Sequence, residues 1–75
     1  MKYIVTIDDD EFEEIFIFPN SVNHNIMAEA ISYMKSNCRR ITRTPISAGF
    51  IEGGKCVGKS ESLGLSSRPQ DSELL

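Results

Sequence analysis

The sequence predicts an α+β domain in which one antiparallel sheet is covered on one face by a single helix. Three observations support this fold class. Only one stretch, His24–Asn37, has apolar residues spaced three and four apart, as on one face of a helix. Two β-branched and aromatic stretches precede it, and another apolar stretch with a Gly-Gly turn follows it. The predicted element order is therefore β-β-α-β-β.

The two stretches before the helix are expected to pair as an antiparallel hairpin. Tyr3–Ile7 and Phe12–Phe18 are rich in residues that favour strands. Pro19 ends the second stretch because it has no N–H to donate to a strand partner. Between them, Asp8–Glu11 is too polar to continue a strand, and Asp favours turns. Both faces of this hairpin carry apolar side chains, so a single helix covers only one of them.

The helix is expected to have an Asn cap at its start and basic residues at its end. Asn23 or Asn25 can accept a hydrogen bond from a free backbone N–H of the first turn. Lys35 in the last turn suits the negative end of the helix dipole. The residues predicted to face the sheet are Met27, Ala30, Ile31, Met34 and Cys38.

The stretch after the helix predicts the second half of the sheet. Ile41–Thr44 alternates weakly and Ile46–Ile51 is the stronger strand, with Pro45 at an edge or a bulge. Gly53–Gly54 predicts a tight hairpin turn, because glycine readily takes the positive φ angles of such turns. A weaker return strand is expected from Cys56 to about Leu63.

The 75 residues make one small domain, predicted to span residues 1–65. Residues 66–75 form a polar tail that is either flexible or docked on the sheet. A core this small supplies only about 3–5 kcal/mol, and one apolar face of the sheet needs a second cover. We expect a homodimer to provide that cover, with the tail as the alternative.

No secretory signal and no membrane-spanning stretch is evident in the sequence. We therefore expect no contact with a membrane, a cytoplasmic location, and reduced thiols at Cys38 and Cys56.

Charge is unevenly distributed along the chain, whose net charge is −3. Residues 1–34 carry seven acids and one Lys, whereas residues 35–60 carry six Lys or Arg and one acid. This separation predicts a charge-polarised surface that binds a partner macromolecule. The candidate partner-binding residues are Asp8, Asp9, Asp10, Glu11, Lys35, Arg39, Arg40 and Arg43.

Gly53–Ser60 matches the phosphate-binding pattern G-x-x-x-x-G-K-[ST]. That pattern binds phosphate where a strand, a loop and a helix follow one another. Gly64 and Pro69 prevent a long helix after it, and too few residues remain for the rest of a nucleotide-binding fold. We interpret the match as chance.

Metal and enzyme chemistry find little support in the sequence. The acidic stretch from Asp8 to Glu14 lacks the Gly and the spacing of an EF-hand calcium loop. His24, Cys38 and Cys56 lack the spacing of zinc ligands. His24 fits the start of the helix, and the two Cys fit small apolar packing groups. We expect no cofactor, no metal and no enzymatic activity.

Nucleic acid is the alternative partner. The basic strip after the helix suits phosphate contacts, since phosphate neutralisation supplies most of such affinity. The acidic pI of about 5.0 opposes this reading, because nucleic-acid-binding domains usually carry a dominant basic surface.

The segments MKYIVTI, SAGFIEGG and GKSESLGLSSRPQDSELL resemble short uncharacterised reading frames of tailed bacteriophages and enterobacterial prophages. The resemblance implies a phage accessory protein that binds and modulates a host protein in the host cytoplasm. It implies no residue roles. Our hypothesis is therefore a small non-enzymatic protein that binds a host protein, with a nucleic-acid-binding regulator as the alternative.

Overall fold

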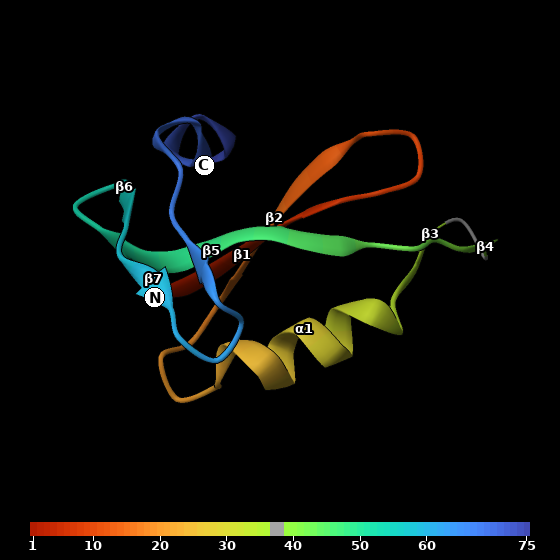
Figure 1. Cartoon of the computed structure of the whole chain (residues 1–75), viewed down its shortest axis with the longest axis horizontal. Helices are drawn as coiled ribbons and strands as arrows, with labels where there is room; N and C mark the ends of the chain where they lie inside the picture. Colours follow the sequence, from red (N-terminus) through yellow and green to blue (C-terminus); the bar gives the residue numbers. More distant parts are fainter. Residues whose placement is uncertain (37–38) are drawn as a thin grey trace.

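The computed structural model describes residues 1–36 and 39–75, and for residues 35, 36, 39 and 40 it describes the backbone only. Its main sheet is antiparallel, has the strand order β2-β1-β5-β6 and packs against one helix, α1 (Figure 1). This confirms the predicted α+β class and the β-β-α-β-β order of the main sheet. The elements are β1 (Lys2–Ile7), β2 (Glu13–Phe18), α1 (His24–Ser32), β3 (Lys35–Ser36), β4 (Arg39–Arg40), β5 (Thr44–Glu52), β6 (Lys55–Val57), β7 (Lys59–Ser60), β8 (Leu65–Ser66) and the 3₁₀ helix η1 (Pro69–Leu74).

The first hairpin forms as predicted. β1 and β2 pair in register along all six residues of each strand. The second strand begins at Glu13, so Phe12 lies in the connecting loop and not in the strand as predicted. Successive side chains alternate between the two faces, with Ile4 on one face of β1 and Tyr3 and Val5 on the other.

β5 carries the two local features that its sequence predicts. The register between β1 and β5 shifts between Val5 and Thr6, which leaves Ile46 without a partner and places Pro45 beside this bulge. Gly53 and Gly54, with φ of 56° and 76°, form the turn into β6. A two-residue hairpin turn of type I′ requires positive φ at both of its central residues.

The return strand is shorter than predicted. β6 ends at Val57, and the chain then leaves the main sheet to form a separate small hairpin from β7 and β8. Gly58, with φ of 78°, lies where the chain turns away. β5 and β6 approach each other closely just before this point. A Cβ atom on Gly49 would lie only 2.4 Å from the carbonyl oxygen of Val57, so the approach requires Gly.

Helix α1 begins at His24 as predicted but ends at Ser32, earlier than expected. Arg43 contacts the chain just beyond this end. Its Nη1 donates to the carbonyl oxygen of Met34 at 3.2 Å, which satisfies a group that a further helical turn would bond. Lys35 consequently lies in β3, and the predicted interaction of Lys35 with the end of the helix dipole is wrong.

The start and the sheet-facing side of α1 also differ from the prediction. Asn23 is the N-cap residue, but its side chain makes no capping hydrogen bond. Among the residues predicted to face the sheet, Ile31 is buried, Met27 packs against the core, Ala30 and Met34 are exposed, and Cys38 lies outside the described residues.

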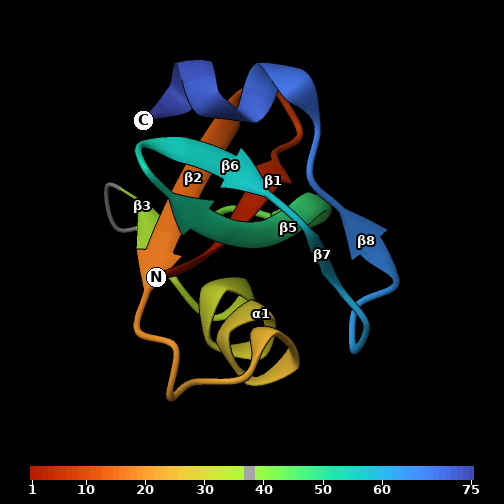
Figure 2. The ribbon, with the colours of Figure 1, turned by 90° about the vertical axis from the view of Figure 1, so that its left-hand side faces the viewer.

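Helix α1 lies over one face of the sheet and η1 over the other (Figure 2). Each face has its own apolar cluster. The cluster under α1 consists of Ile4, Phe18, Ile31 and Ala48, with Leu63 and Leu65 from the β7–β8 hairpin packed against it. The opposite face lies under η1, and its buried residues are Tyr3, Val5 and Cys56, with Leu74 packed against them.

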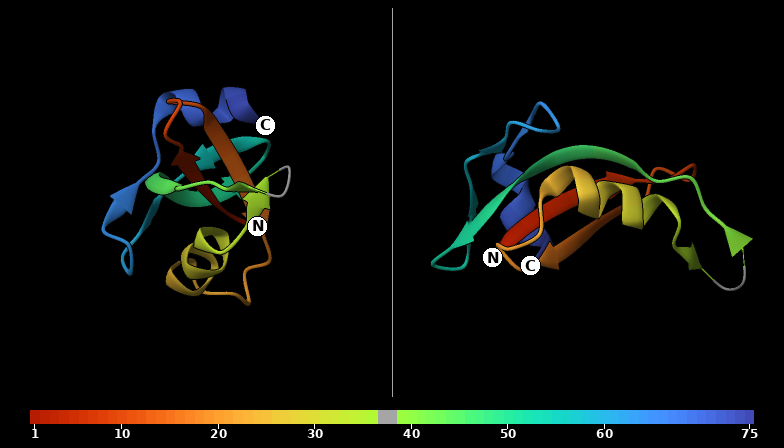
Figure 3. Two further views of the ribbon diagram at one scale, coloured as in Figure 1. Left: turned by 90° about the vertical axis from the view of Figure 1, so that its right-hand side faces the viewer. Right: turned by 90° about the horizontal axis from the view of Figure 1, so that it is seen from below.

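The C-terminal tail thus covers the face for which a second copy was expected. Residues 69–74 form η1, and the N–H of Cys56 donates to Oγ of Ser72 at 3.0 Å. The apolar face of the sheet therefore no longer argues for a homodimer, and the homodimer stays a prediction. The molecule is elongated, at 35 × 24 × 19 Å, with the β3–β4 hairpin at one end of its long axis (Figure 3).

Candidate functional site: an acidic loop at one end of the molecule

The loop between β1 and β2 carries the acidic residues predicted from the sequence, and it is organised by Asp8. Oδ1 of Asp8 accepts hydrogen bonds from the backbone N–H groups of Asp10 and Phe12, each at 2.9 Å. The Asp8 carbonyl oxygen accepts a further bond from the Glu11 N–H at 3.0 Å. Asp favours turns through such local bonds. Asp8 therefore shapes the loop, and its carboxylate is occupied there.

Glu11 holds an unfavourable backbone conformation in this loop. Its φ is 63°, and among the described residues every other positive φ belongs to glycine. The Asp8 N–H donates to the Phe12 carbonyl oxygen, so Asp9, Asp10 and Glu11 form a three-residue hairpin loop. Such a loop commonly has Gly at its left-handed position, which Glu11 occupies here. A side chain with a Cβ costs roughly 1–2 kcal/mol there. Glu11 is nevertheless exposed, and it forms no ion pair with any residue whose side chain the structure describes.

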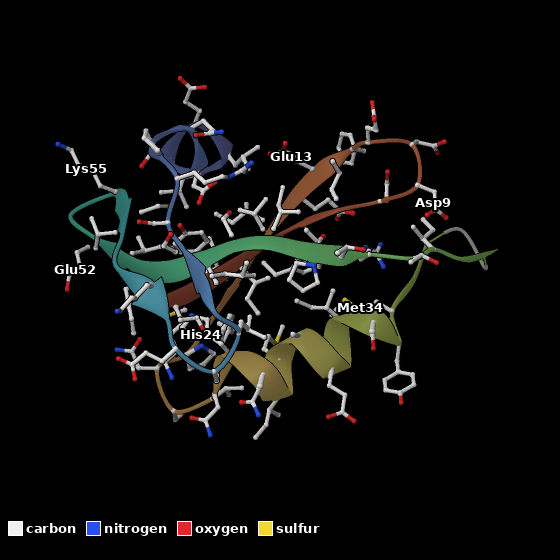
Figure 4. All side chains as sticks on the ribbon, viewed as in Figure 1. Asp9, Glu13, His24, Met34, Glu52 and Lys55 are labelled. Carbon is white, nitrogen blue, oxygen red and sulfur yellow. The ribbon has the colours of Figure 1, made fainter. Side chains whose placement is uncertain are left out.

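We call the four exposed residues of this loop the acidic end: Asp9, Asp10, Glu11 and Phe12. The Phe12 side chain is unusual for an aromatic group, since the residue is 62% exposed. Asp9 lies at one end of the molecule, and Glu52 and Lys55 lie at the other (Figure 4). The acidic end thus combines three exposed carboxylates with one exposed aromatic ring.

Arg43, predicted to belong to the partner-binding strip, points inward instead. Its side chain is 6% exposed, and its Nε donates to Oε1 of Glu14 at 3.3 Å. Its guanidinium also lies over the ring of Phe16, 5.8 Å from the centroid. Arg43 ties the end of α1 to β2 and is not available to a partner. The partner-binding role of Arg43 stays a prediction, and this geometry does not favour it.

The other three basic candidates belong to one hairpin. Lys35 is in β3, and Arg39 and Arg40 are in β4, which pairs with β3. Their side chains lie outside the description. The backbone of this hairpin lies at the same end of the molecule as the β1–β2 loop (Figure 1). The acidic and basic segments therefore share one end and do not form two opposite poles.

An open cleft of about 630 Å³ lies in the other half of the molecule, where α1 begins. Its lining residues are Lys2, Asn23, His24, Asn25, Phe50, Lys59, Ser60, Glu61 and Ser62. His24 is buried, its ring packs edge-on against Phe18 and Phe50, and its Nε2–H donates to the carbonyl oxygen of Gly49 at 2.9 Å. His24 thus joins α1 to β5, and its sequence-based interpretation as a helix-start residue is confirmed.

The residues of the phosphate-binding pattern do not have the context that the pattern needs. Gly53 and Gly54 form the β5–β6 turn, and Lys59 and Ser60 form strand β7 where a helix would be required. Oγ of Ser60 accepts the N–H of Leu63 at 3.3 Å and caps the turn between β7 and β8. The match in the sequence therefore does not correspond to a phosphate-binding loop.

Within residues 1–36 and 39–75, no group of three His, Cys, Asp or Glu side chains converges on a point where a metal ion would bind. Glu13 and Glu14, which continue the acidic stretch, bond to Arg68 and Arg43. Burial raises the pKa of the Cys56 thiol, so this thiol stays protonated at neutral pH. The second thiol, on Cys38, lies outside the described residues.

A buried polar network under the tail was not predicted from the sequence. Asp71 is fully buried, and its carboxylate accepts hydrogen bonds from the Tyr3 hydroxyl, the Arg68 N–H and Arg68 Nε at 2.6–2.9 Å. Burial opposes ionisation of Asp71, but these donors outweigh it and lower its pKa. Arg68 Nη2 also donates to Glu13 at 2.8 Å. Pro69 at the first position of η1 and Asp71 at the third are helix-start signals that could have located this turn.

These features define the class of the molecule: a small α+β protein with two covered sheet faces and an exposed acidic loop. Comparisons of the chain with models of protein families, with curated proteins and with solved structures found no match. In the part of the chain that the structure describes, no helix is long and apolar enough to cross a membrane.

Proposed function

We propose that this protein is a non-enzymatic binding protein whose acidic end docks onto a basic surface of a partner protein. The single observation that carries the proposal is the conformation of Glu11. A position that favours Gly holds an exposed carboxylate in the loop, and no side chain that the structure describes pairs with it to offset the strain. Strain retained at an exposed position motivates a functional role for the residue.

Phe12 supplies the apolar part of the proposed interface. Protein interfaces combine a few aromatic anchors with charges that orient the partner. The ring of Phe12 is 62% exposed and directly follows three exposed carboxylates. The partner surface therefore has Lys or Arg side chains around a pocket that accepts one aromatic ring. The resemblance to phage accessory reading frames makes a host protein the expected source of that surface.

The nucleic-acid alternative has weaker support. Arg43 is engaged inside the molecule, which removes one of the four residues of the basic strip. The remaining three lie on a hairpin at the same end as the acidic loop, whose carboxylates repel phosphate. We therefore retain the protein partner as the proposed function.

Affinity capture from an enterobacterial lysate tests the proposal with variants that keep the fold. The Glu11→Gly variant removes one carboxylate and relieves the backbone strain, so loss of binding by this variant cannot come from loss of stability. The Asp9→Asn/Asp10→Asn pair removes two further charges and leaves Asp8 to hold the loop. Glu52→Gln removes an exposed carboxylate at the other end of the molecule and is the matched control.

We expect one protein that the wild type and Glu52→Gln retain and that both acidic-end variants lose. Its retention should fall as salt rises, because salt screens exposed charges. The proposal fails if Glu11→Gly and Asp9→Asn/Asp10→Asn retain every protein that the wild type retains.

A further inference from the structure

β2 is an exposed edge of the main sheet. It stands at one end of the strand order, and among the described residues its backbone bonds only to β1. Such an edge presents free N–H and C=O groups on which another strand can pair. The opposite edge of the sheet, β6, is shorter and is partly covered. It has only three residues, one of them Lys55, and the tail bonds its Cys56 N–H.

β2 lacks the features by which proteins usually protect an edge. Its six residues, EEIFIF, contain no Lys and no Pro, and its pairing with β1 shows no bulge. The two acids at its start are engaged within the chain, Glu13 with Arg68 and Glu14 with Arg43. Ile17 lies opposite Tyr3 on the face under η1 and remains 47% exposed.

We infer that β2 pairs antiparallel with β2 of a second copy, so that two four-stranded sheets form one continuous sheet. In an antiparallel pair, residues that lie opposite each other point to the same face of the sheet. Two copies of β2 meet this condition when the pairing is centred on one residue, which then lies opposite the same residue of the second copy. The register centred on Phe16 sets Ile15 opposite Ile17 of the second copy. It also sets Glu14 opposite Phe18, so no two carboxylates face each other. In this register apolar residues of the edge lie opposite one another, and the carboxylates of the two copies do not meet.

This arrangement is independent of the proposed partner-binding surface. The acidic end precedes β2 in the chain, and an antiparallel pairing about Phe16 places the two acidic ends at opposite extremes of the dimer. Each copy then binds its partner separately. Failure of the dimer would leave the proposed function untouched, and loss of partner binding would leave the dimer untouched.

Light scattering and sedimentation of the full chain over a wide concentration range test the inference. We expect a species of twice the 8.4 kDa chain mass. Ile17→Lys places a charge at the paired edge in both copies and should raise the dissociation constant of the dimer by about tenfold or more. Ile26→Lys is the matched control, because Ile26 is 55% exposed on the outer side of α1. Circular dichroism verifies that both variants are folded.

Hydrogen exchange identifies the edge that pairs. The amides of β2 that do not bond to β1 should gain protection as concentration rises, while those of β6 should not. A monomer at high micromolar concentration overturns the inference. So does a dimer that Ile17→Lys leaves intact or in which the β2 amides stay unprotected, because such a dimer uses another surface.

Discussion

The hydroxyl of Tyr3 donates a 2.6 Å hydrogen bond to Asp71, a residue 68 positions further along the chain, and both side chains are fully buried. Tyr3 lies in β1 at the centre of the sheet, and Asp71 lies in η1. The bond therefore fastens the C-terminal tail to the face that it covers. A buried carboxylate is tolerated there because Tyr3 and Arg68 both donate to it.

The Tyr3→Phe substitution should destabilise the fold by about 2 kcal/mol, because a hydrogen bond to a charged group contributes about 1.5–3 kcal/mol. The substitution keeps the ring and removes only the donor. Urea unfolding followed by circular dichroism measures the change in free energy of unfolding. Tyr33→Phe is the matched control, since Tyr33 is 66% exposed and its hydroxyl should contribute less than about 0.5 kcal/mol. Equal effects of the two substitutions would contradict the structural role of the bond.

Stability should fall at acid pH through Asp71. Burial alone would raise the pKa of Asp71, but its hydrogen bonds hold the pKa below the usual value of about 3.9. The unfolded chain therefore binds this proton first as pH falls. The stabilisation is present above about pH 4 and is lost progressively below it. Urea unfolding across the acid range should show this loss, and Asp71→Asn should lower stability at neutral pH and flatten the acid limb. If the free energy of unfolding of Asp71→Asn falls at acid pH as steeply as that of the wild type, the loss of stability comes from other carboxylates.

Stability should also fall at alkaline pH through Tyr3. Burial, and then the neighbouring Asp71, raise the pKa of Tyr3 above its usual value of about 10. The folded state consequently keeps the phenol proton after the unfolded chain has lost it. The stabilisation is complete below about pH 10 and is lost as pH rises further. In Tyr3→Phe this alkaline decline should become shallower, and the same decline in both proteins would argue against Tyr3 as its source.

Glu11→Gly should stabilise the fold by roughly 0.5–1 kcal/mol. The substitution relieves a Cβ conflict of about 1–2 kcal/mol, and the greater entropy that Gly loses on folding offsets part of this gain. Glu11→Ala removes the charge but keeps the Cβ, so it should give no comparable gain. Thermal unfolding of the two variants beside the wild type separates strain from charge. A Gly variant no more stable than the Ala variant would show that φ at this position costs little.

The parts of the fold that local signals specify were predictable from the sequence. Strand-favouring residues specify the first hairpin, Pro45 specifies a bulge, and Gly53–Gly54 specifies a turn. Each of these features depends on residues adjacent in the chain. The docking of the tail does not, because the partner of Asp71 is Tyr3 at the opposite end of the sequence. The cover of the second sheet face was therefore assigned to a second copy in the sequence-based prediction.

The candidate site was predictable in part for the same reason. The acidic character of the loop follows directly from its residues, but the different structural roles of those residues do not. Asp8 is used to build the turn, whereas Glu11 carries the strain. Counting charges also placed Arg43 on the surface, since a charge count contains no information about side-chain direction. The side chain in fact reaches across the sheet to Glu14.

Arg43→Ala should destabilise the fold by about 1–3 kcal/mol and loosen the end of α1. The guanidinium bonds to Glu14 and to the Met34 carbonyl oxygen, and its removal leaves that carbonyl without its donor. Arg43→Lys should be nearly as damaging, because an ammonium group cannot reproduce the planar geometry of two divergent N–H donors. Lys55→Ala, at an exposed turn, is the matched control and should change stability by less than about 0.5 kcal/mol. Hydrogen exchange should show faster exchange of the last amides of α1 in the Arg43 variants alone. If Arg43→Ala proves as mild as Lys55→Ala, Arg43 does not hold the helix end, and its place in a surface strip has to be reconsidered.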